Sequence, residues 1–390
     1  MKVFFRRIHL YLGLAAGLVI MICCLTGAIL VFQKELEQAF NKERYFVQDV
    51  GNKLSLDSLV GGVKRVYPTA KINTVKAYAD NKRTTEINVS IAENKLSQKA
   101  PVAQPGAEQR PTTLTAFVNP YSGEVVELYN SRQGFFYNTM ALHRWLLGSN
   151  NGPGKIITGV ATLIFLIILV TGIILWWPKT KNILKQRLKL KTTAGWKRLN
   201  HDLHIVLGFY SSIFLFVFAF TALAWSFEWF NKGIYKVTAS SMKAPEVPKS
   251  TFSGSKKPIS FDLAYSVALE KFANKDFYTI AAPKDSVGAI NITGLDKDAV
   301  HETATDVIYL DQYSGNVLGQ YLFSDRNLGA QVRASFRPVH VGSIWGTTSK
   351  IIALIVCILG TTFPITGVIM WINRTRKKKT TIAKKAIVEA

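Results

Sequence analysis

Four long apolar runs constrain this chain more than any other feature of its sequence. They span residues 8–32, 156–177, 205–227 and 351–372, and none of them contains Asp, Glu, Lys or Arg. About 20 consecutive apolar residues are needed to cross the hydrocarbon core of a bilayer as a helix. Runs of this length and uniformity predict four transmembrane helices rather than the buried helices of a soluble protein.

Positive charge is concentrated on one side of these expected spans. The net charge is +23, and eight Lys and Arg residues with no acid fill the connection 178–200. Further basic residues cluster at the N-terminus and after residue 373. All three segments lie on the same side of a four-span chain, and the positive-inside rule predicts that this side is cytoplasmic. The distribution favours membrane topology and attraction to anionic lipid, and argues against nucleic-acid binding.

The expected organisation is that of a multi-pass protein of the bacterial inner membrane with both termini in the cytoplasm. The first run is too long for a signal peptide and has no small-residue cleavage site, so we expect it to be retained. The fold class is an all-α four-helix transmembrane bundle with two large periplasmic domains. The segments are transmembrane helices at 1–33, 143–178, 201–228 and 340–373, periplasmic domains at 34–142 and 229–339, a basic loop at 179–200 and a basic tail at 374–390.

The two halves of the chain repeat one order of motifs, which indicates an internal duplication. A Tyr-Ser-Gly sequence precedes a Thr-Gly pair by 50 residues in the first half and by 53 in the second. Such repeats suggest a pseudo-twofold axis along the membrane normal, and we interpret the Thr-Gly pairs as helix-packing sites. The matching motifs are Tyr121-Ser122-Gly123 with Tyr313-Ser314-Gly315, Thr171-Gly172 with Thr366-Gly367, and His9-x-x-x-Gly13 with His204-x-x-x-Gly208.

Each outer segment has the pattern of a small α+β unit. Helical spacing with a Ser or Asp cap begins each unit, and alternating strands follow it. The helices are expected at 54–67 and 260–272. The strands are expected at 71–79, 83–91, 114–118 and 124–128, and at 277–281, 289–292, 306–310 and 317–321.

Five of the six histidines lie at the ends of the expected spans. His9 begins the first span, and His201 and His204 begin the third, all on the expected cytoplasmic side. His143 precedes the second span and His340 precedes the fourth, both on the opposite side. Each face of the membrane therefore offers ligand candidates from two different helices, as in bundles that bind cofactors between facing helices.

Paired histidines of this kind favour two haem b groups, one near each face of the membrane. Two imidazoles on opposite sides of a porphyrin leave no axial position open, which suits electron transfer. We expect His9 with His204 at one site and His143 with His340 at the other, and His201 remains an alternative to His204. The sequence lacks the C-x-x-C-H motif of covalent haem attachment.

Small and basic residues near the histidines are further candidates for cofactor binding. Gly13 and Gly208 lie one turn after two of the histidines and would let a flat macrocycle lie against the helix. Arg144 follows one outer histidine, and Arg333 and Arg337 precede the other. These arginines suit haem propionates or an anionic substrate, and anchoring at the interface is an equally good interpretation. A zinc site is disfavoured because neither pair has a thiol or carboxylate partner in the sequence.

Taken together and in order, these motifs resemble those of the PepSY-associated transmembrane proteins, also described as iron-regulated membrane proteins. The resemblance covers about residues 3–375 and rests on the His-x-x-x-Gly motifs, the sequence Leu142-His143-Arg144-Trp145, the Tyr-Ser-Gly turns and the Thr-Gly-x-x-x-Trp ends. It implies PepSY-like outer domains, and some relatives are di-haem reductases of ferric siderophores. Larger relatives carry a reductase-like domain after the last span. Only about 18 residues follow that span here, so a separate cytoplasmic protein or a quinol is the expected donor.

The leading hypothesis is transmembrane electron transfer by a haem-dependent ferric-siderophore or ferric-chelate reductase. A cytoplasmic-side haem receives an electron, which passes to an outer haem and then to a periplasmic acceptor in an iron-acquisition process. The alternative is a haem-free regulator whose outer domains bind peptides or a protease. A permease is disfavoured because the spans contain few polar residues.

Overall fold

The computed structural model describes all residues except 49–50, 92–111, 253, 255–256 and 389–390. The chain divides into two compact units, each built from segments that are distant in the sequence. The helical unit comprises Met1–Gln33, Phe135–Val237 and Ser335–Ala390. The sheet unit comprises Lys34–Gly134 and Thr238–Ala334.

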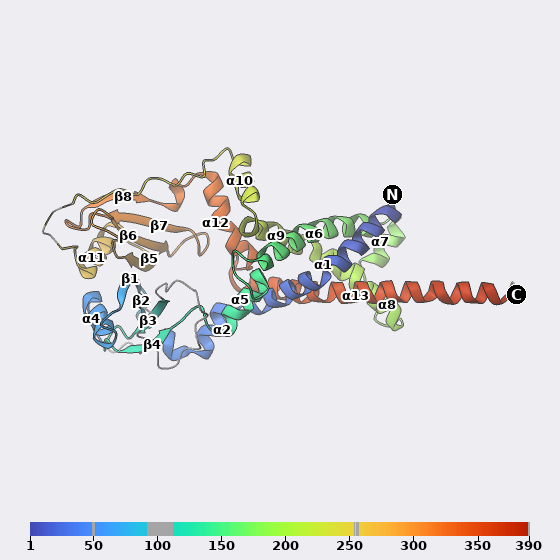
Figure 1. Cartoon of the computed structure of the whole chain (residues 1–390), viewed down its shortest axis with the longest axis horizontal. Coiled ribbons are helices and arrows are strands. Elements are labelled where there is room, and N and C mark those ends of the chain that lie inside the picture. Colours follow the sequence, from blue (N-terminus) through green and yellow to red (C-terminus); the bar gives the residue numbers. More distant parts are fainter. Residues whose placement is uncertain (49–50, 92–111, 253, 255–256, 389–390) are drawn as a thin grey trace. The chain divides into compact units, whose positions relative to one another are not determined.

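Four helical spans in the helical unit confirm the prediction from the apolar runs. Each is long and apolar enough to cross a membrane. The first, second and fourth are continuous helices, whereas the third consists of two α-helices joined by a π-helix (Figure 1). They are α1 (Lys2–Leu30), α6 (Pro153–Trp176), α8 (Trp196–Asp202) with η2 (Leu203–Leu207) and α9 (Gly208–Ser226), and α13 (Gly346–Val388).

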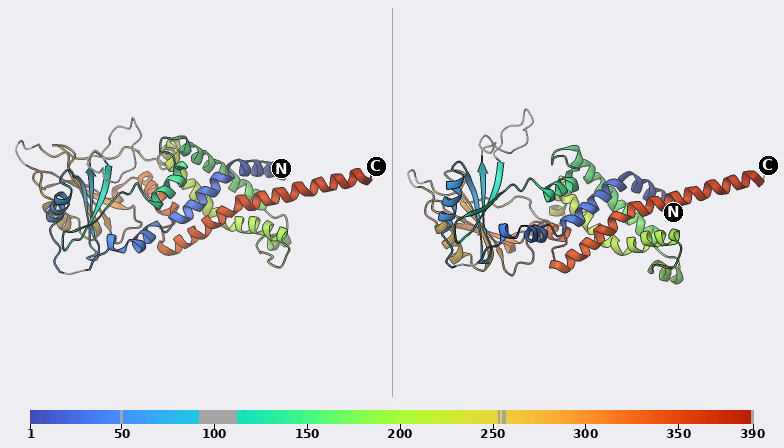
Figure 2. Two further views of the ribbon diagram at one scale, coloured as in Figure 1. Left: turned by 60° about the horizontal axis from the view of Figure 1, so that its bottom comes forward. Right: turned by 90° about the horizontal axis from the view of Figure 1, so that it is seen from below.

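The spans form a four-membered bundle in which α1 and α9 are each flanked by α6 and α13 (Figures 1 and 2). Small residues in the spans allow the helices to approach one another closely. A Cβ added to Gly17 would lie 3.3 Å from the Cβ of Pro364, and one added to Gly360 would lie 2.8 Å from the Sγ of Cys24. The interior between the helices is apolar, with Ala16, Ile20, Leu215 and Val356 among its buried residues.

Shorter helices complete the helical unit. The helix α5 packs against both α1 and α6, and the hydroxyl of Thr158 on α6 donates to the carbonyl of Arg144 on α5. The connection 178–200 carries one short helix, and the first span begins at the same end of the bundle, where Lys2 Nζ donates to the carbonyl of Trp177. These helices are α5 (Phe135–Trp145), α7 (Lys181–Arg187), α10 (Glu228–Val237) and the C-terminal part of α12 (Leu328–His340).

A single antiparallel sheet of eight strands forms the sheet unit, in the order β4-β3-β2-β1-β5-β6-β7-β8. The predicted strands and helices are all present, with ends shifted by a few residues. The strands are β1 (Lys71–Tyr78), β2 (Thr85–Ile91), β3 (Thr112–Val118), β4 (Val125–Tyr129), β5 (Lys275–Ala281), β6 (Ile290–Asp296), β7 (Thr305–Leu310) and β8 (Val317–Tyr321). The helices are α2 (Gln33–Phe40), α3 (Lys42–Tyr45), α4 (Leu56–Val66), α11 (Phe261–Lys271) and the 3₁₀-helix η3 (Phe323–Asp325).

The strands of the two outer segments form one continuous sheet, which two separate domains would not do. The first strand of each half pairs antiparallel with the other, β1 with β5, so that Val75 lies opposite Ile280. Each half alone would expose the edge of this strand, and pairing the two edges removes a site of unwanted strand association. The outer segments therefore fold as one compact unit with a common core.

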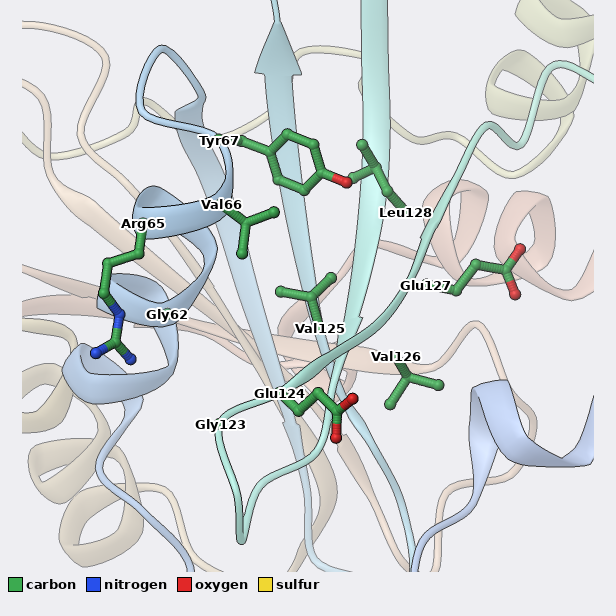
Figure 3. A pocket seen from close by; sticks show the side chains of 10 residues that line it. All are labelled: Gly62, Arg65, Val66, Tyr67, Gly123, Glu124, Val125, Val126, Glu127 and Leu128. Carbon is green, nitrogen blue, oxygen red and sulfur yellow. The ribbon is translucent and has the colours of Figure 1, made fainter.

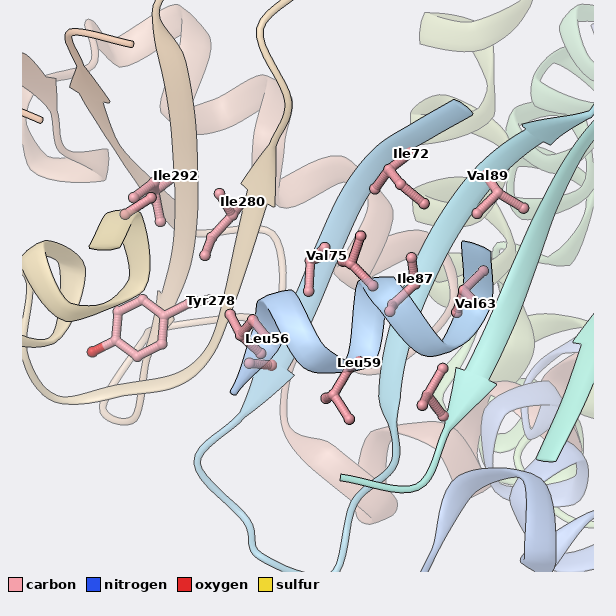
Figure 4. Close-up of a cluster of buried hydrophobic side chains, with 14 of the residues drawn as sticks. Leu56, Leu59, Val63, Ile72, Val75, Ile87, Val89, Tyr278, Ile280 and Ile292 are labelled. Atoms are coloured by element: carbon pink, nitrogen blue, oxygen red, sulfur yellow. The ribbon is translucent and has the colours of Figure 1, made fainter. Parts of the chain in front are cut away.

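That core lies between one face of the sheet and the helices α4 and α11 (Figure 4). Alternate residues of the central strands are fully buried there, and the helices add Leu59 and Val63 from α4 and Ala264 and Ala268 from α11. The sequence left Ser55 and Asp57 as alternative caps, and Ser55 is the N-cap of α4, where it accepts from the backbone N–H of Ser58 at 3.2 Å. Burial of alternate strand positions against these helices is the main contribution to the stability of this unit.

The two helices also cap each other. The carboxylate of Asp57 in α4 accepts from the backbone N–H groups of Phe261 and Asp262, both at 3.1 Å. The carboxylate of Asp262 in α11 accepts from the N–H groups of Leu56 and Asp57 at 2.6 and 3.2 Å. Each aspartate thus satisfies free N–H groups in the first turn of the other helix, where negative charge is also favoured by the helix dipole.

We predict that Asp57→Ala weakens the sheet unit in a pH-dependent manner. Burial would raise the pKa of Asp57, but hydrogen bonds from Asp262, Ser260 and Phe261 outweigh burial and hold this pKa below its ordinary value. A carboxylate of lowered pKa contributes its stability above the ordinary value of about 3.9 and loses it as the pH falls through the folded value. Loss of one cap costs about 1 kcal/mol.

The measurement is limited proteolysis of the sheet unit during thermal unfolding of the full chain at several pH values. The variant should unfold at a lower temperature than the wild type near pH 7, and the difference should shrink below about pH 4. Glu270→Ala on the exposed face of α11 is the matched control. A difference of the same size at pH 7 and pH 3 would show that the carboxylate charge does not matter.

Candidate functional site

Four histidines meet in two pairs inside the helical unit. The ring of His9 on α1 lies opposite that of His204 in η2, with 6.4 Å between the ring centroids. The ring of His143 on α5 lies opposite that of His340 at the end of α12, with 6.2 Å between centroids. These are the two pairings expected from the repeat, and the structure brings both of them together across the bundle.

The first pair is held by hydrogen bonds to α6 and α13. The Nδ1 atom of His9 lies 3.1 Å from the carbonyl oxygen of Ile168 and 3.0 Å from the Oγ1 of Thr171. The Nδ1 atom of His204 lies 2.8 Å from the Oγ1 of Thr366. His204 also lies within a π-helix, a departure from α-helical geometry that is frequent at functional sites.

The second pair is held in the same way by α1 and α9. The Nδ1 atom of His143 lies 3.0 Å from both the carbonyl oxygen of Cys23 and the Oγ1 of Thr26. The Nδ1 atom of His340 lies 3.0 Å from the carbonyl oxygen of Phe218 and 3.1 Å from the Oγ1 of Thr221. Every histidine of the two pairs thus contacts a threonine, and His9, His143 and His340 also contact the carbonyl three residues before that threonine.

These contacts assign the proton of each ring to Nδ1. A carbonyl oxygen can only accept a hydrogen bond, so the nitrogen that faces it must donate. A neutral imidazole carries one N–H, and the other nitrogen, Nε2, then keeps its lone pair. A metal-bound histidine commonly donates its second nitrogen to a carbonyl in this manner. His9, His143 and His340, which face a carbonyl, therefore have the protonation that coordination through Nε2 requires.

The separation of the rings also fits coordination of one metal ion between them. A metal–imidazole bond is about 2.0 Å long and the ring centre lies about 1.1 Å further on, so two opposed imidazoles have centroids roughly 6.3 Å apart. A direct N–H···N hydrogen bond of about 2.9 Å would bring the centroids to roughly 5 Å. The observed 6.4 and 6.2 Å exceed the second separation and leave room for a metal ion between the rings. The ring planes cross at 84° and 63°, and coordination from opposite sides permits either angle.

Glycines leave room beside the rings. A Cβ added to Gly13 would meet no atom within 4 Å, and one added to Gly208 would meet only Phe363, at 4.0 Å. Both positions are half-buried, so there is open space one turn after His9 and His204. A flat macrocycle needs such space, and on this observation the residues present fit a bis-imidazole haem.

The two pairs lie far apart along the bundle. On α1, His9 belongs to one pair and Thr26 contacts the other, and the same 17-residue spacing separates His204 from Thr221 in the third span. Seventeen helical residues extend roughly 25 Å, which is close to the thickness of the hydrocarbon core of a bilayer, about 30 Å. One pair therefore lies toward each end of the spans.

The other predicted candidates have different surroundings. His201 directs its Nδ1 toward the carboxylate of Asp202 at 3.3 Å, and it is His204 that faces His9. Asp202 is fully buried and also binds the Nε of Arg198 at 2.9 Å. Arg144 is half-buried next to His143, with its guanidinium 5.0 Å from the ring centre of Trp145. Arg337 is exposed one turn before the last histidine.

The four threonines Thr26, Thr171, Thr221 and Thr366 were not predicted from the sequence as contacts of the histidines. The Thr-Gly pairs were interpreted only as helix-packing sites, and in the structure they also contact the imidazoles. An added Cβ would come within 3.3 Å of the ring at Gly172 and Gly367 and within 3.5 Å at Gly27. A signal was present, because His9 and His204, Thr26 and Thr221, and Thr171 and Thr366 are each 195 positions apart.

A separate groove of about 390 Å³ lies in the sheet unit between α4 and β4 (Figure 3). Val66, Tyr67, Val125 and Leu128 provide an apolar lining, and the side chains of charged residues lie around it (Figure 3). The strand β4 is at one edge of the sheet. This groove contains none of the predicted site residues, and it has the shape and position that suit an extended peptide.

Comparison with known families gives one match over nearly the whole chain. The family described as the PepSY-associated TM region matches residues 6–374, a range that includes all four histidines and both outer segments. No curated protein matches the sequence. The match agrees with the resemblance inferred from the motifs and with a multi-pass membrane protein.

Proposed function

The chain belongs to the PepSY-associated TM family, and we propose that it is a di-haem b protein that moves electrons across the bacterial inner membrane. The proposed acceptor is periplasmic, a ferric siderophore or another ferric chelate, and the activity is that of a ferric-chelate reductase. The observation that carries the proposal is the pair of neighbouring imidazoles at each end of the bundle, with ring centroids 6.4 and 6.2 Å apart and each Nδ1 within hydrogen-bond distance of a threonine hydroxyl.

In this proposal His9 and His204 hold one haem and His143 and His340 hold the other. A haem with two imidazole ligands supplies one-electron redox chemistry and has no open position for oxygen. The protein contributes fixed ligand orientation through the carbonyl and hydroxyl contacts of Nδ1. Its apolar interior between the pairs excludes water and keeps the electron from side reactions.

Basic residues near the second pair suit anionic groups. Arg144 adjoins His143, and Arg337 lies one turn before His340. Either guanidinium can form bidentate hydrogen bonds with a carboxylate, such as a haem propionate or a carboxylate of a ferric chelate. Both termini and the basic loop are proposed to be cytoplasmic by the positive-inside rule, which makes the second pair the periplasmic one. The donor is then a separate cytoplasmic protein or a quinol.

The proposal predicts a reduced-minus-oxidised absorption spectrum with the Soret and α bands of low-spin haem b. Purified protein, expressed with haem supplied, should contain about two haems per chain because it has two histidine pairs. Oxidation of the reduced protein by a ferric chelate should follow on mixing. A preparation that folds as a membrane protein but shows no Soret band would rule the proposal out.

The groove beside β4 favours one alternative, a haem-free membrane regulator whose sheet unit binds a peptide or a protease. An extended segment could pair with the free edge of β4 and place apolar side chains against Tyr67 and Leu128. This function would leave the four histidines dispensable. Activity that survives replacement of all four would therefore favour the alternative over electron transfer.

A further inference from the structure

We infer that Thr26, Thr171, Thr221 and Thr366 are positioning residues that hold the four histidines in the Nδ1–H form and fix the rotation of each ring. The inference concerns the hydroxyl groups of the threonines, because packing alone would require only the shape of these side chains. Its cofactor consequences rest on the proposed function, whereas the protonation of the rings can be tested without any cofactor.

The first argument comes from the number of hydrogen bonds that each threonine hydroxyl can donate. Each hydroxyl lies within hydrogen-bond distance of the carbonyl four residues earlier on its own helix, and a hydroxyl has only one proton to donate. Its remaining lone pair faces the histidine and can only accept, so the Nδ1 nitrogen must carry the proton. The distances to the helix carbonyls are 2.6 Å for Thr26 to Ile22, 2.9 Å for Thr171 to Ile167, 2.8 Å for Thr221 to Val217 and 3.1 Å for Thr366 to Thr362.

Two acceptors at one nitrogen hold the ring more firmly than one. At His9, His143 and His340 the carbonyl of the residue three positions before the threonine lies at the same nitrogen, so the hydroxyl is a second acceptor there that favours the Nδ1–H form and, approaching from another direction, restricts the rotation of the ring. At His143 both acceptors lie at 3.0 Å. Both also increase electron density on the imidazole, which makes Nε2 a stronger metal ligand.

The surroundings of the four threonines distinguish a hydrogen-bonding role from a role in packing alone. The four threonines are between 3% and 8% exposed, so a valine of nearly the same shape would fill the same space. Only the acceptor oxygen would be lost. The same arrangement recurs at all four histidines on four different helices, which a chance contact between buried residues would not produce.

The test compares valine and serine at the second pair. Thr26→Val and Thr221→Val should each weaken haem retention at that pair by about 10- to 100-fold, the usual effect of removing such a contact behind a metal ligand. Serine at either position keeps the hydroxyl and should restore retention. Thr162→Val is the matched control, because the Thr162 hydroxyl likewise bonds a carbonyl of its own helix, that of Thr158 at 2.8 Å.

Two readouts report ring orientation rather than folding. The electron paramagnetic resonance signal of low-spin ferric haem depends on the angle between the two imidazole planes, and the midpoint potential depends on ligand basicity. Both should change in the valine variants at one site only, with the other site as an internal control. Valine variants with the signal, potential and haem retention of the wild type would overturn the inference.

Histidine ¹⁵N resonances of haem-free protein separate this inference from the proposed function. The wild-type rings should be in the Nδ1–H form, and valine at a threonine position should increase the Nε2–H population of its partner histidine. Wild-type protein that binds no haem would defeat the proposed function and leave this result standing. Wild-type rings in the Nε2–H form would defeat the inference even if haem is bound.

Discussion

A His204→Ala variant is expected to retain about half of the haem of the wild type, whereas His201→Ala retains all of it. The two residues are three positions apart and the sequence does not distinguish them as ligands. In the structure only His204 faces His9, while His201 bonds Asp202. Loss of one of two axial imidazoles removes the haem at that pair and leaves the pair of His143 and His340 intact. The measurement is the haem-to-protein ratio with a redox titration, which should show a single remaining component.

Matched variants make this result decisive. His9→Ala should resemble His204→Ala, because both remove a ligand of the same pair. His301→Ala should resemble the wild type, since His301 lies in the sheet unit, where its ring bonds Thr303. Ferric-chelate reduction should be lost in both ligand variants. Equal haem loss in the His201 and His204 variants would contradict the assignment of the first pair.

The second large effect is expected from the glycines that follow two of the threonines. In Gly367→Leu and Gly172→Leu the new side chain must occupy the space of a histidine ring, because a Cβ alone would lie 3.3 Å from the Cε1 of His204 or His9. Each variant should therefore lose the haem of the first pair, about half of the total, while the haem of the second pair remains. The spectrum and the haem-to-protein ratio measure this loss.

A control glycine distinguishes displacement of the ring from a general effect of leucine in a helix. Gly233 lies in α10 of the same unit, and a Cβ there would meet no atom within 4 Å. Gly233→Leu should keep both haems. Gly367→Ala, which adds only the Cβ, should retain more haem than the leucine variant. If Gly367→Leu keeps both haems, the ring of His204 does not lie where the structure puts it.

The spans and strands followed from the sequence because their signals are local. Four uniformly apolar runs predicted four helices, and all four are present. The two Tyr-Ser-Gly turns are also local, since Gly123 and Gly315 adopt φ of +73° and +76°, and Asn119 and Asp311 accept from backbone N–H groups of their own turns. Such turns depend on residues within a few positions of one another.

The break in the third span was not predictable from composition. The run 205–227 begins within a π-helix, and α8 extends the span back to Trp196. A π-helix inserts one residue into a helix and leaves no mark on average hydropathy. The pairing of β1 with β5 was likewise absent from the pattern, because alternation identifies a strand but not its neighbour.

The sequence by itself determined the number of spans, the positions of the histidines at their ends and the family of the chain. Hydrophobic length and charge distribution are sums over neighbouring residues, so they can be read along the chain. The tertiary structure alone decided that His204 and not His201 lies beside His9, and that each imidazole meets a threonine of another element. Those partners lie between 117 and 162 positions away, and only helix packing brings their atoms within hydrogen-bond distance.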